Sequence, residues 1–259
     1  MAPLDAPLPA GPAAPVLSPA EGAALARAAR LDALHGSKDA AGILRAAIAA
    51  FPGKLALVSS FGADAATLLH LVSTVEPSLP VIFIDTGKHF GDTLTYRDRL
   101  VARFGLTDVR SVGPDPERLA AEDPEGALWF HEADRCCAVR KVEPLARALE
   151  GFDAWITGRK RYQAATRSGL HAFEADGARV KVNPLIAWSR DDVHAYITTH
   201  DLPPHPLVAQ GFPSIGCMPC TDRVAPGEDE RAGRWRGQAK TECGIHLGLV
   251  GREKDGSGI

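Results

Sequence analysis

Residues 54–64 read KLALVSSFGAD, and this stretch decides the expected fold. Four apolar residues, Leu55–Val58, are followed at once by small and polar residues that end at Asp64. This order is typical of a buried strand that leads through a turn into a helix. Small residues let backbone amides approach a phosphate, and the helix N-terminus adds favourable partial charge. An ordinary strand–helix turn with a serine cap explains the same residues equally well.

The same stretch lacks the GxxxxGK[ST] pattern of a Walker loop and the GxGxxG dinucleotide fingerprint, so it supports neither of those nucleotide sites.

Three further short apolar runs continue the alternation along the chain. They lie at Val81–Ile84, Val109–Val112 and 154–157, and helix-like stretches at about 64–75, 91–104 and 138–150 separate them or follow them. Near-continuous apolar strands that alternate with helices predict a parallel sheet covered on both faces. We therefore expect a doubly wound, mostly parallel α/β fold, in which ligands bind beyond the carboxyl ends of the strands.

Two helices are predicted before this unit and one after it. Ser18, Pro19 and Glu21 form a capping-box pattern that starts a helix toward His35, and a second helix covers 39–51. The last third is less regular, with one helix at about 190–200 and a proline-bearing loop at 203–206. We expect the Pro- and Ala-rich residues 1–16 and the polar, Gly-rich end of the chain to be mobile.

Composition places the chain among ordinary soluble domains. It has 259 residues, of which 45% are hydrophobic and 24% charged, and a net charge of -3. No global basic field is available for phosphate neutralisation, which disfavours nucleic acid as a partner. No apolar run reaches the roughly 18 to 20 residues that span a bilayer, and no export signal is recognised, so we expect no membrane partner and a cytoplasmic location. The oligomeric state is open, and a homo-oligomer is one outcome.

The cysteines carry the most specific pattern. Five are present, an odd number without an export signal, which favours ligation or catalysis over disulfides. Cys136 and Cys137 are adjacent, and Cys217 and Cys220 form a CxxC pair. Sulfur-only ligation selects zinc or an iron–sulfur cluster. The vicinal pair departs from the usual zinc knuckle and favours a cluster, although spacing does not exclude zinc and buried cysteine also serves as a small hydrophobe.

The fifth cysteine stands apart, in the string Glu242-Cys243-Gly244-Ile245-His246. Cations precede it, and nearby positive charge lowers a thiol pKa and raises the thiolate fraction. The alternative is a spare surface thiol near the end of the chain.

Two more strings follow predicted strands. Asp85-Thr86-Gly87 either contacts a ribose or is a polar strand terminus with a turn glycine. Residues 158–167 hold four cations, which form a solvated basic loop or, beside a phosphate cradle, an anion clamp.

Together these strings resemble the assimilatory adenylyl-sulfate reductases, the iron–sulfur branch of the phosphosulfate reductase family. The resemblance runs from about Leu55 to Gly248. It implies an adenine nucleotide alpha hydrolase-like, Rossmann-like fold and a 4Fe-4S cluster on Cys136, Cys137, Cys217 and Cys220. It also implies that Cys243 is the nucleophile.

The resemblance also assigns substrate residues. The phosphate loop and the second nucleotide motif correspond to Ser59, Ser60, Gly62, Asp64, Asp85, Thr86 and Gly87. The arginine loop contributes Gly158, Arg159 and Arg167. Lys141 matches a lysine between cluster and substrate, and anion-binding positions fall on Arg231, Arg234 and His246, the last of which either tunes the thiol or holds the sulfonate. Tyr162 and Ala164-Ala165 depart from the family pattern, which usually has an aspartate and a serine-proline there.

The implied reaction is reduction of adenosine 5'-phosphosulfate (APS) to sulfite and AMP, in sulfate assimilation and cysteine biosynthesis. Thioredoxin or a similar dithiol would be the donor and a cysteine S-sulfonate the intermediate. The expected organisation is a disordered segment 1–16, a nucleotide- and cluster-binding domain 17–225, and a mobile segment 226–259 with the catalytic cysteine. One alternative is a 3'-phosphoadenylyl-sulfate (PAPS) reductase. Another is an ATP pyrophosphatase-type or zinc-stabilised nucleotide-binding protein, although Ala63 stands where that class more often has glycine.

Overall fold

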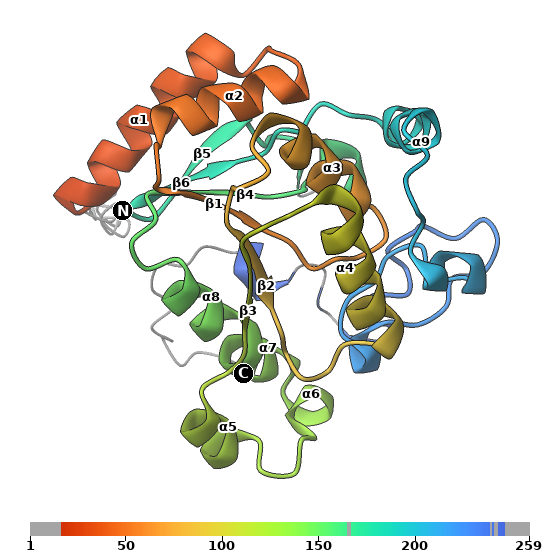
Figure 1. The fold of residues 1–259 in the computed structure, drawn as a ribbon. Helices are drawn as coiled ribbons and strands as arrows, with labels where there is room; N and C mark the ends of the chain where they lie inside the picture. Colours follow the sequence, from red (N-terminus) through yellow and green to blue (C-terminus); the bar gives the residue numbers. More distant parts are fainter. Residues whose placement is uncertain (1–16, 165–166, 239, 241–242, 247–259) are drawn as a thin grey trace, which may run out of the picture.

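A six-stranded sheet forms the centre of the molecule (Figure 1). The structure is a computed structural model and describes residues 17–164, 167–238, 240 and 243–246. The strand order is β3-β2-β1-β4-β6-β5. The strands are β1 (Leu55–Val58), β2 (Val81–Ile84), β3 (Val109–Val112), β4 (Ala154–Ile156), β5 (Phe173–Asp176) and β6 (Arg179–Val182). Neighbouring strands are parallel except for β5 and β6, which pair antiparallel at one edge.

The first four strands confirm the predicted apolar runs, and the mostly parallel order confirms the doubly wound fold. The hairpin of β5 and β6 was not predicted. Its residues read FEAD and RVKV, so polar and charged side chains interrupt the apolar pattern. Two of them, Asp176 and Lys181, are buried in the structure as an ion pair at 3.1 Å.

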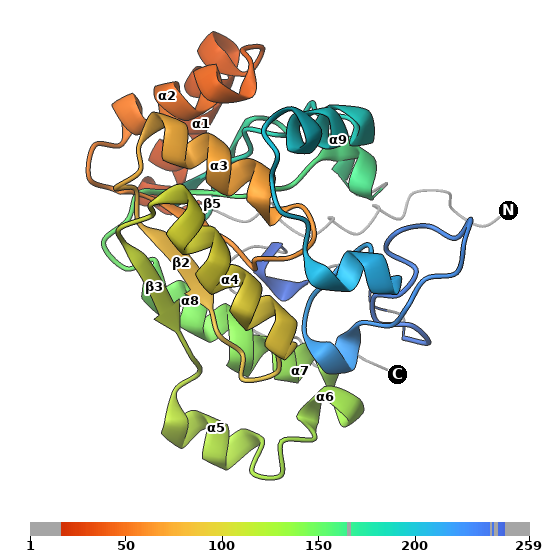
Figure 2. The same ribbon diagram turned by 45° about the vertical axis from the view of Figure 1, so that its right-hand side comes forward.

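Helices cover both faces of the sheet. They are α1 (Pro19–His35), α2 (Ala40–Ala50), α3 (Ala65–Val75), α4 (Gly91–Phe104), α5 (Pro116–Glu122), α6 (Leu128–His131), α7 (Ala133–Cys137), α8 (Glu143–Ala148) and α9 (Arg190–Thr199). Figure 2 shows α3 and α4 on one side of the strands and α8 on the other. The capping box at Ser18 and Glu21 is present as predicted.

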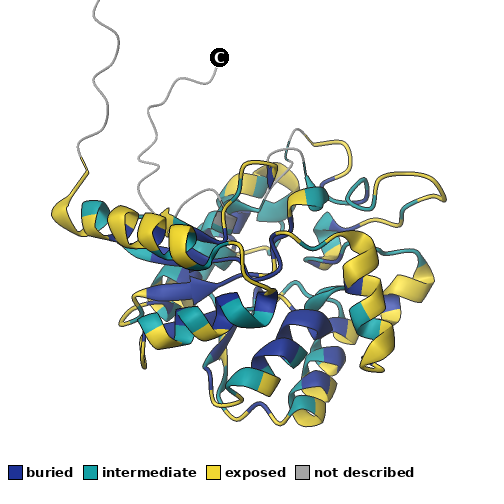
Figure 3. Ribbon diagram, turned by 90° about the horizontal axis from the view of Figure 1, so that it is seen from above, coloured by how far each residue is buried: buried dark blue, intermediate teal, exposed yellow. Residues whose placement is uncertain are grey.

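The two faces follow from the two-residue period of a strand. Leu55 and Leu57 of β1 point into the larger core under α1–α4, whereas Ala56 points into the smaller core under α8. Seen from above, the strands and the inner faces of the helices are buried, and exposed residues lie on the outer faces (Figure 3). No helix in the described part of the chain is long and apolar enough to cross a membrane.

The helix predicted at 138–150 is interrupted. The α-helix α7 ends at Cys137, a π-helical turn covers Ala138–Val142, and α8 then begins at Glu143. Pro144 explains the break, because proline has no amide hydrogen to give to the carbonyl four residues earlier. Single π-turns of this kind are frequent at functional sites.

The order of the strands determines where a ligand-binding crevice forms. The chain runs outward from β1 to β2 and β3, and then returns to place β4 on the other side of β1. Loops after β1 and β4 therefore diverge and leave a crevice at the carboxyl ends of these strands, which is where doubly wound sheets bind ligands.

Candidate functional site

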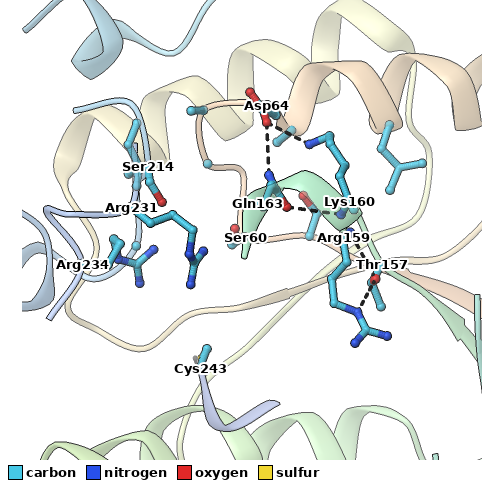
Figure 4. Close-up of a pocket in the computed structure, with 18 of the residues that line it drawn as sticks. Ser60, Asp64, Thr157, Arg159, Lys160, Gln163, Ser214, Arg231, Arg234 and Cys243 are labelled. Carbon is cyan, nitrogen blue, oxygen red and sulfur yellow. Dashed lines mark hydrogen bonds and ion pairs between the residues drawn. The ribbon is translucent and has the colours of Figure 1, made fainter. Parts of the chain in front are cut away.

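A pocket of about 260 Å³ opens in this crevice. It is lined from the loop after β1, the loop after β4, the π-turn and the segments at 213–216 and 229–235. Many residues that the sequence assigned to substrate or catalysis line it: Ser59, Ser60, Gly62, Asp64, Lys141, Gly158, Arg159, Arg167, Arg231, Arg234 and Cys243. Figure 4 shows Asp64 and Cys243 across the space from one another, with Arg231 and Arg234 together at one side.

The loop after β1 is held in a tight turn. Phe61 has a φ of 49°, and its buried ring packs edge-on against Phe83 at 5.6 Å. The Phe61 amide donates to the Ser59 hydroxyl at 3.2 Å. A Cβ on Gly62 would lie 3.1 Å from the carbonyl oxygen of Ile215, so the two loops approach closely here. The turn therefore brings small residues and the first turn of α3 to the pocket wall, as anion binding requires.

Asp64 does not cap α3 through its side chain. Its carboxylate instead accepts a hydrogen bond at 2.8 Å from the ammonium of Lys160, whose side chain is 2% exposed. Gln163 lies beside this pair and accepts from the Lys160 amide (Figure 4). Nothing in the sequence separates Lys160 from the other cations of its loop, and neither Lys160 nor Gln163 is among the predicted site residues.

Arg159 is held along one edge of its guanidinium by protein acceptors. Its Nη2 donates to Glu174 of β5 at 2.6 Å, and its Nε and Nη2 both donate to the buried amide oxygen of Asn183. Burial lowers the pKa of Arg159, and the carboxylate of Glu174 opposes this effect. Among the described residues Nη1 has no hydrogen-bond acceptor, so one edge of the guanidinium is held by protein while the other stays available to an anion.

Arg234 is held between the ring of Trp235 and the backbone carbonyl of Cys220. Its guanidinium lies 4.5 Å from the ring of Trp235, and its Nε donates to the carbonyl of Cys220 at 3.4 Å. A Cβ on Gly216 would lie 2.2 Å from its Nη2, so only glycine leaves room for this guanidinium.

Cys243 immediately precedes a turn at Gly244–His246 that packs on the π-helical turn. A Cβ on Gly244 would lie 3.1 Å from Val142. The Cys243 sulfur accepts a hydrogen bond from the Cys137 thiol, and Lys141, the Ile245 amide and Arg234 add favourable interactions that outweigh burial. Together they hold the pKa of Cys243 well below its usual range. The side chain of His246 lies outside the described residues.

Lys141 faces this thiolate. Burial acts to lower the pKa of Lys141, but electrostatic interactions with the neighbouring sulfurs, that of Cys243 first, outweigh it and raise the pKa. Lys141 therefore stays charged beside Cys243, between the pocket and the remaining cysteines.

The four paired cysteines line a second, small cavity behind the π-turn. Cys136, Cys137, Cys217 and Cys220 reach it together with Lys88, Trp129, Arg140, Lys141 and Pro219. No three of the described His, Cys, Asp or Glu side chains are grouped closely enough to hold a single metal ion. The donor set nevertheless suits a thiolate-bound metal cluster, because the cavity is lined by four sulfurs and three cations, with no carboxylate.

Residues Asp85, Thr86 and Gly87 lie outside the lining of the pocket, and Thr86 instead contacts two residues of the cysteine cavity. The Thr86 hydroxyl is 3.3 Å from the sulfur of Cys217, and the Thr86 carbonyl accepts from Arg140 at 2.8 Å. Asp85 accepts from the Gly87 amide. From this part of the chain, Ile84 and His89 line the pocket instead.

Comparison with known proteins identifies the family of this chain. The phosphoadenosine phosphosulfate reductase domain family matches residues 54–223. An adenosine 5'-phosphosulfate reductase of Mesorhizobium japonicum is 56% identical over 223 residues, which cover 86% of this chain and 88% of the relative. One from Chelativorans sp. is 53% identical over 222 residues, covering 85% and 91%.

A solved structure is also similar. The phosphate complex of phosphoadenylyl-sulfate reductase from Candida auris aligns with a TM-score of 0.64 and 29% identity, over 76% of this chain and 96% of that chain. Sequence and fold agree, and this chain belongs to the phosphoadenosine phosphosulfate reductase domain family.

Proposed function

We propose that this protein reduces APS to sulfite and AMP. One observation carries the proposal: the Cys243 sulfur lines a cation-lined pocket beside Lys141 and Arg234, and a phosphate-binding type of loop closes the pocket on the opposite side. The names of the two curated relatives support the choice of APS as the substrate.

In the first step the Cys243 thiolate attacks the sulfur of the sulfate group. A sulfur–sulfur bond forms, the bond from sulfur to the phosphate oxygen breaks, and AMP leaves with that electron pair. The product on the protein is a cysteine S-sulfonate. Covalent catalysis of this kind divides one difficult reduction into two displacements.

Charge is the physical obstacle, because an anionic nucleophile approaches an anionic substrate. Lys141 and Arg234 lie close enough to Cys243 to stabilise its thiolate, and Arg159 and Arg231 line the same pocket. These cations offset the repulsion and stabilise the charge that develops on the departing phosphate.

A dithiol donor completes the reaction. Its thiolate attacks the sulfur of Cys243, sulfite leaves, and the second thiol of the donor resolves the mixed disulfide. The sulfate sulfur is thereby reduced and the dithiol oxidised to a disulfide. Thioredoxin is the proposed donor, and a reducing cytoplasm is the proposed location, because thiols are kept reduced there.

The proposed cofactor is a 4Fe-4S cluster on Cys136, Cys137, Cys217 and Cys220. When bound, it would supply a fixed charge and a structural tie between the end of α7 and the segment that holds Cys217 and Cys220. Lys141 lies four residues after Cys137, in the π-helical turn that continues from α7, so the residues that would hold the cluster also help to position the ammonium that faces Cys243.

The proposed domain 17–225 carries the sheet, and the proposed mobile segment 226–259 carries Cys243. In this structure Lys240 forms an ion pair with Asp134 of α7, which holds the segment against the cysteine pair. Residues 1–16 and 247–259 of the proposed mobile ends lie outside the described residues.

The test is to mix anaerobically purified, reduced protein with APS in the absence of any dithiol, and to measure the protein mass. We expect the mass of one added sulfonate on Cys243 and an equivalent amount of free AMP. The Cys243→Ser variant is the matched control, which should bind AMP normally and gain no mass. An unmodified wild-type protein, or an adduct that persists in Cys243→Ser, would contradict the proposed route.

A further inference from the structure

The β5–β6 hairpin, which the sequence did not predict, contacts the pocket wall through Arg159. Neither Glu174 of β5 nor Asn183, directly after β6, is among the residues that line the pocket. Both donate or accept hydrogen bonds with side chains around Arg159, which does line it. The hairpin therefore supports a cation of the pocket wall without lining the pocket itself.

The amide of Asn183 has one favourable orientation. Asn183 is fully buried, and its Oδ1 accepts from the Thr157 hydroxyl at 2.7 Å and from Arg159. Its Nδ2 donates to the carbonyl of His171 at 2.8 Å and to the carboxylate of Glu174 at 2.7 Å. A flipped amide would direct its hydrogens at the guanidinium and its oxygen at two acceptors, so these contacts would be lost. The Asn183 oxygen is therefore an acceptor in a fixed place.

Glu174 supplies the charge that faces this guanidinium. Its carboxylate accepts from Nη2 of Arg159 at 2.6 Å, and the two side chains are 20% and 8% exposed. Other charges nearby are Arg167, which repels the guanidinium, and Asp176, which attracts it but is already paired with Lys181. A carboxylate at hydrogen-bond distance compensates a buried arginine most effectively, so Glu174 is the main counter-charge of Arg159.

Contacts along one edge of a planar guanidinium fix the direction of the other edge. Arg159 presents its Nε and Nη2 hydrogens to Asn183 and Glu174, and within the described ranges its Nη1 has no acceptor. Figure 4 shows the Arg159 side chain beside Thr157. Because Arg159 lines the pocket, its Nη1 hydrogens are left for an anionic oxygen of a bound nucleotide.

We propose that Glu174 is a positioning residue, which holds Arg159 with its Nη1 edge ready to bind an anionic group of the nucleotide. The inference rests on the proposed function, because that function assigns Arg159 to an anionic substrate. Without Glu174 the guanidinium loses its shortest hydrogen bond and its main counter-charge, and repulsion from Arg167 favours other rotamers. An arginine with several accessible rotamers loses that freedom when the nucleotide binds, which weakens binding.

The experiment measures the Kd of AMP by isothermal titration and kcat/KM for APS, on full-length, anaerobically purified protein. Glu174→Ala removes the acceptor, and we expect AMP binding and kcat/KM to weaken about tenfold, as for the loss of one charged hydrogen bond. Glu174→Gln keeps an acceptor oxygen but forms a bond about half as strong, so it should lose only about threefold. If Glu174 acted only by its charge on the bound anion, both variants would bind AMP more tightly.

Two controls keep the test specific. Asp108→Ala removes the carboxylate of another arginine pair, which joins Asp108 to Arg110 at 2.6 Å outside the pocket lining, and it should leave the Kd of AMP unchanged. In an Arg159→Ala background, Glu174→Ala should cause no further loss, because its effect acts through the guanidinium. Thermal unfolding shows whether each variant folds, and the same cycle is measured with Glu174→Gln if Glu174→Ala does not fold.

The outcomes separate the two proposals. The positioning role would be overturned by tighter or unchanged AMP binding in Glu174→Ala, by an equally large loss in Glu174→Gln, or by a further loss in the Arg159→Ala background. The Kd of AMP does not depend on the reaction at Cys243, so wild-type protein that takes up no sulfonate but shows the expected Kd values would overturn the reductase function alone. Wild-type protein that binds no AMP would overturn both.

Discussion

Replacing Gly216 with alanine tests the geometry of the nucleophile directly. The new Cβ would lie 2.2 Å from Nη2, 2.6 Å from Cζ and 2.9 Å from Nη1 of Arg234. Because real Cβ contacts stay beyond about 3 Å, the guanidinium has to move away from Trp235 and from the Cys220 carbonyl. Gly216 lines the pocket but has no role of its own in the proposed mechanism, so the comparison with Arg234 variants tests whether its effect passes through Arg234.

The expected magnitude follows from the contact that is lost. A hydrogen bond or ion contact that involves a charged group contributes about 1.5 to 3 kcal/mol. Since each 1.36 kcal/mol is tenfold in rate, kcat/KM for APS should fall roughly 10- to 150-fold in Gly216→Ala. The alkylation of Cys243 should also require higher pH, because Arg234 helps to lower its pKa.

Steady-state reduction of APS and thermal unfolding are measured on Gly216→Ala, Arg234→Ala and the double variant. Gly91→Ala is the matched control, because a Cβ at Gly91 meets nothing within 4 Å. The double variant should be no slower than Arg234→Ala alone. Two results would refute the reasoning. One is a wild-type kcat/KM in Gly216→Ala together with a reduced kcat/KM in Arg234→Ala. The other is a double variant in which the two losses in kcat/KM add.

Three more predictions follow from buried charges. Burial lowers the pKa of His205 to about 4. The unfolded chain then binds a proton that folded His205 does not, so about 3 kcal/mol of the stability present above pH 6.5 is lost by about pH 4. His205→Gln should flatten this dependence in urea unfolding, and an unaltered slope would contradict it. Asp176→Asn leaves Lys181 as an unpaired buried charge and should lower the free energy of unfolding by about 3 kcal/mol, measured with urea; a change below about 1 kcal/mol would show that the pair is not needed. Lys141→Met should raise the pKa of Cys243, seen as slower iodoacetamide labelling below pH 8; an identical pH profile would exclude the lysine as its partner.

The sheet was predictable where its strands are buried on both faces. Leu55–Val58 and Val81–Ile84 are apolar throughout, so their sequence shows both their extent and their burial. The β5–β6 hairpin escaped prediction because Asp176 and Lys181 neutralise one another inside the fold. In the sequence, two oppositely charged residues that form a buried ion pair a few positions apart look the same as the polar residues of an exposed turn.

The sequence motifs that form the site could be predicted, but the contacts that their side chains make could not. The turn after Leu55–Val58 and the cations after β4 line one pocket, as the fold class requires. Sequence spacing did not show that Thr86 contacts a cysteine instead of the pocket, or that Cys243 lies against Cys137. These placements depend on long-range packing.

The two edges of the sheet bear on how the protein behaves at high concentration. At one edge, Asp32 of α1 accepts the backbone amide of Phe173 in β5, so a polar group that would recruit another strand is already occupied. At the other edge β3 is four residues long and presents the exposed Arg110, whose guanidinium pairs with Asp108. Edge strands that are short, carry charged side chains or have their backbone groups already hydrogen-bonded resist pairing with a strand of another molecule. The molecule should therefore stay dispersed in crowded solution, and its losses on storage should come from thiol oxidation sooner than from fibril growth.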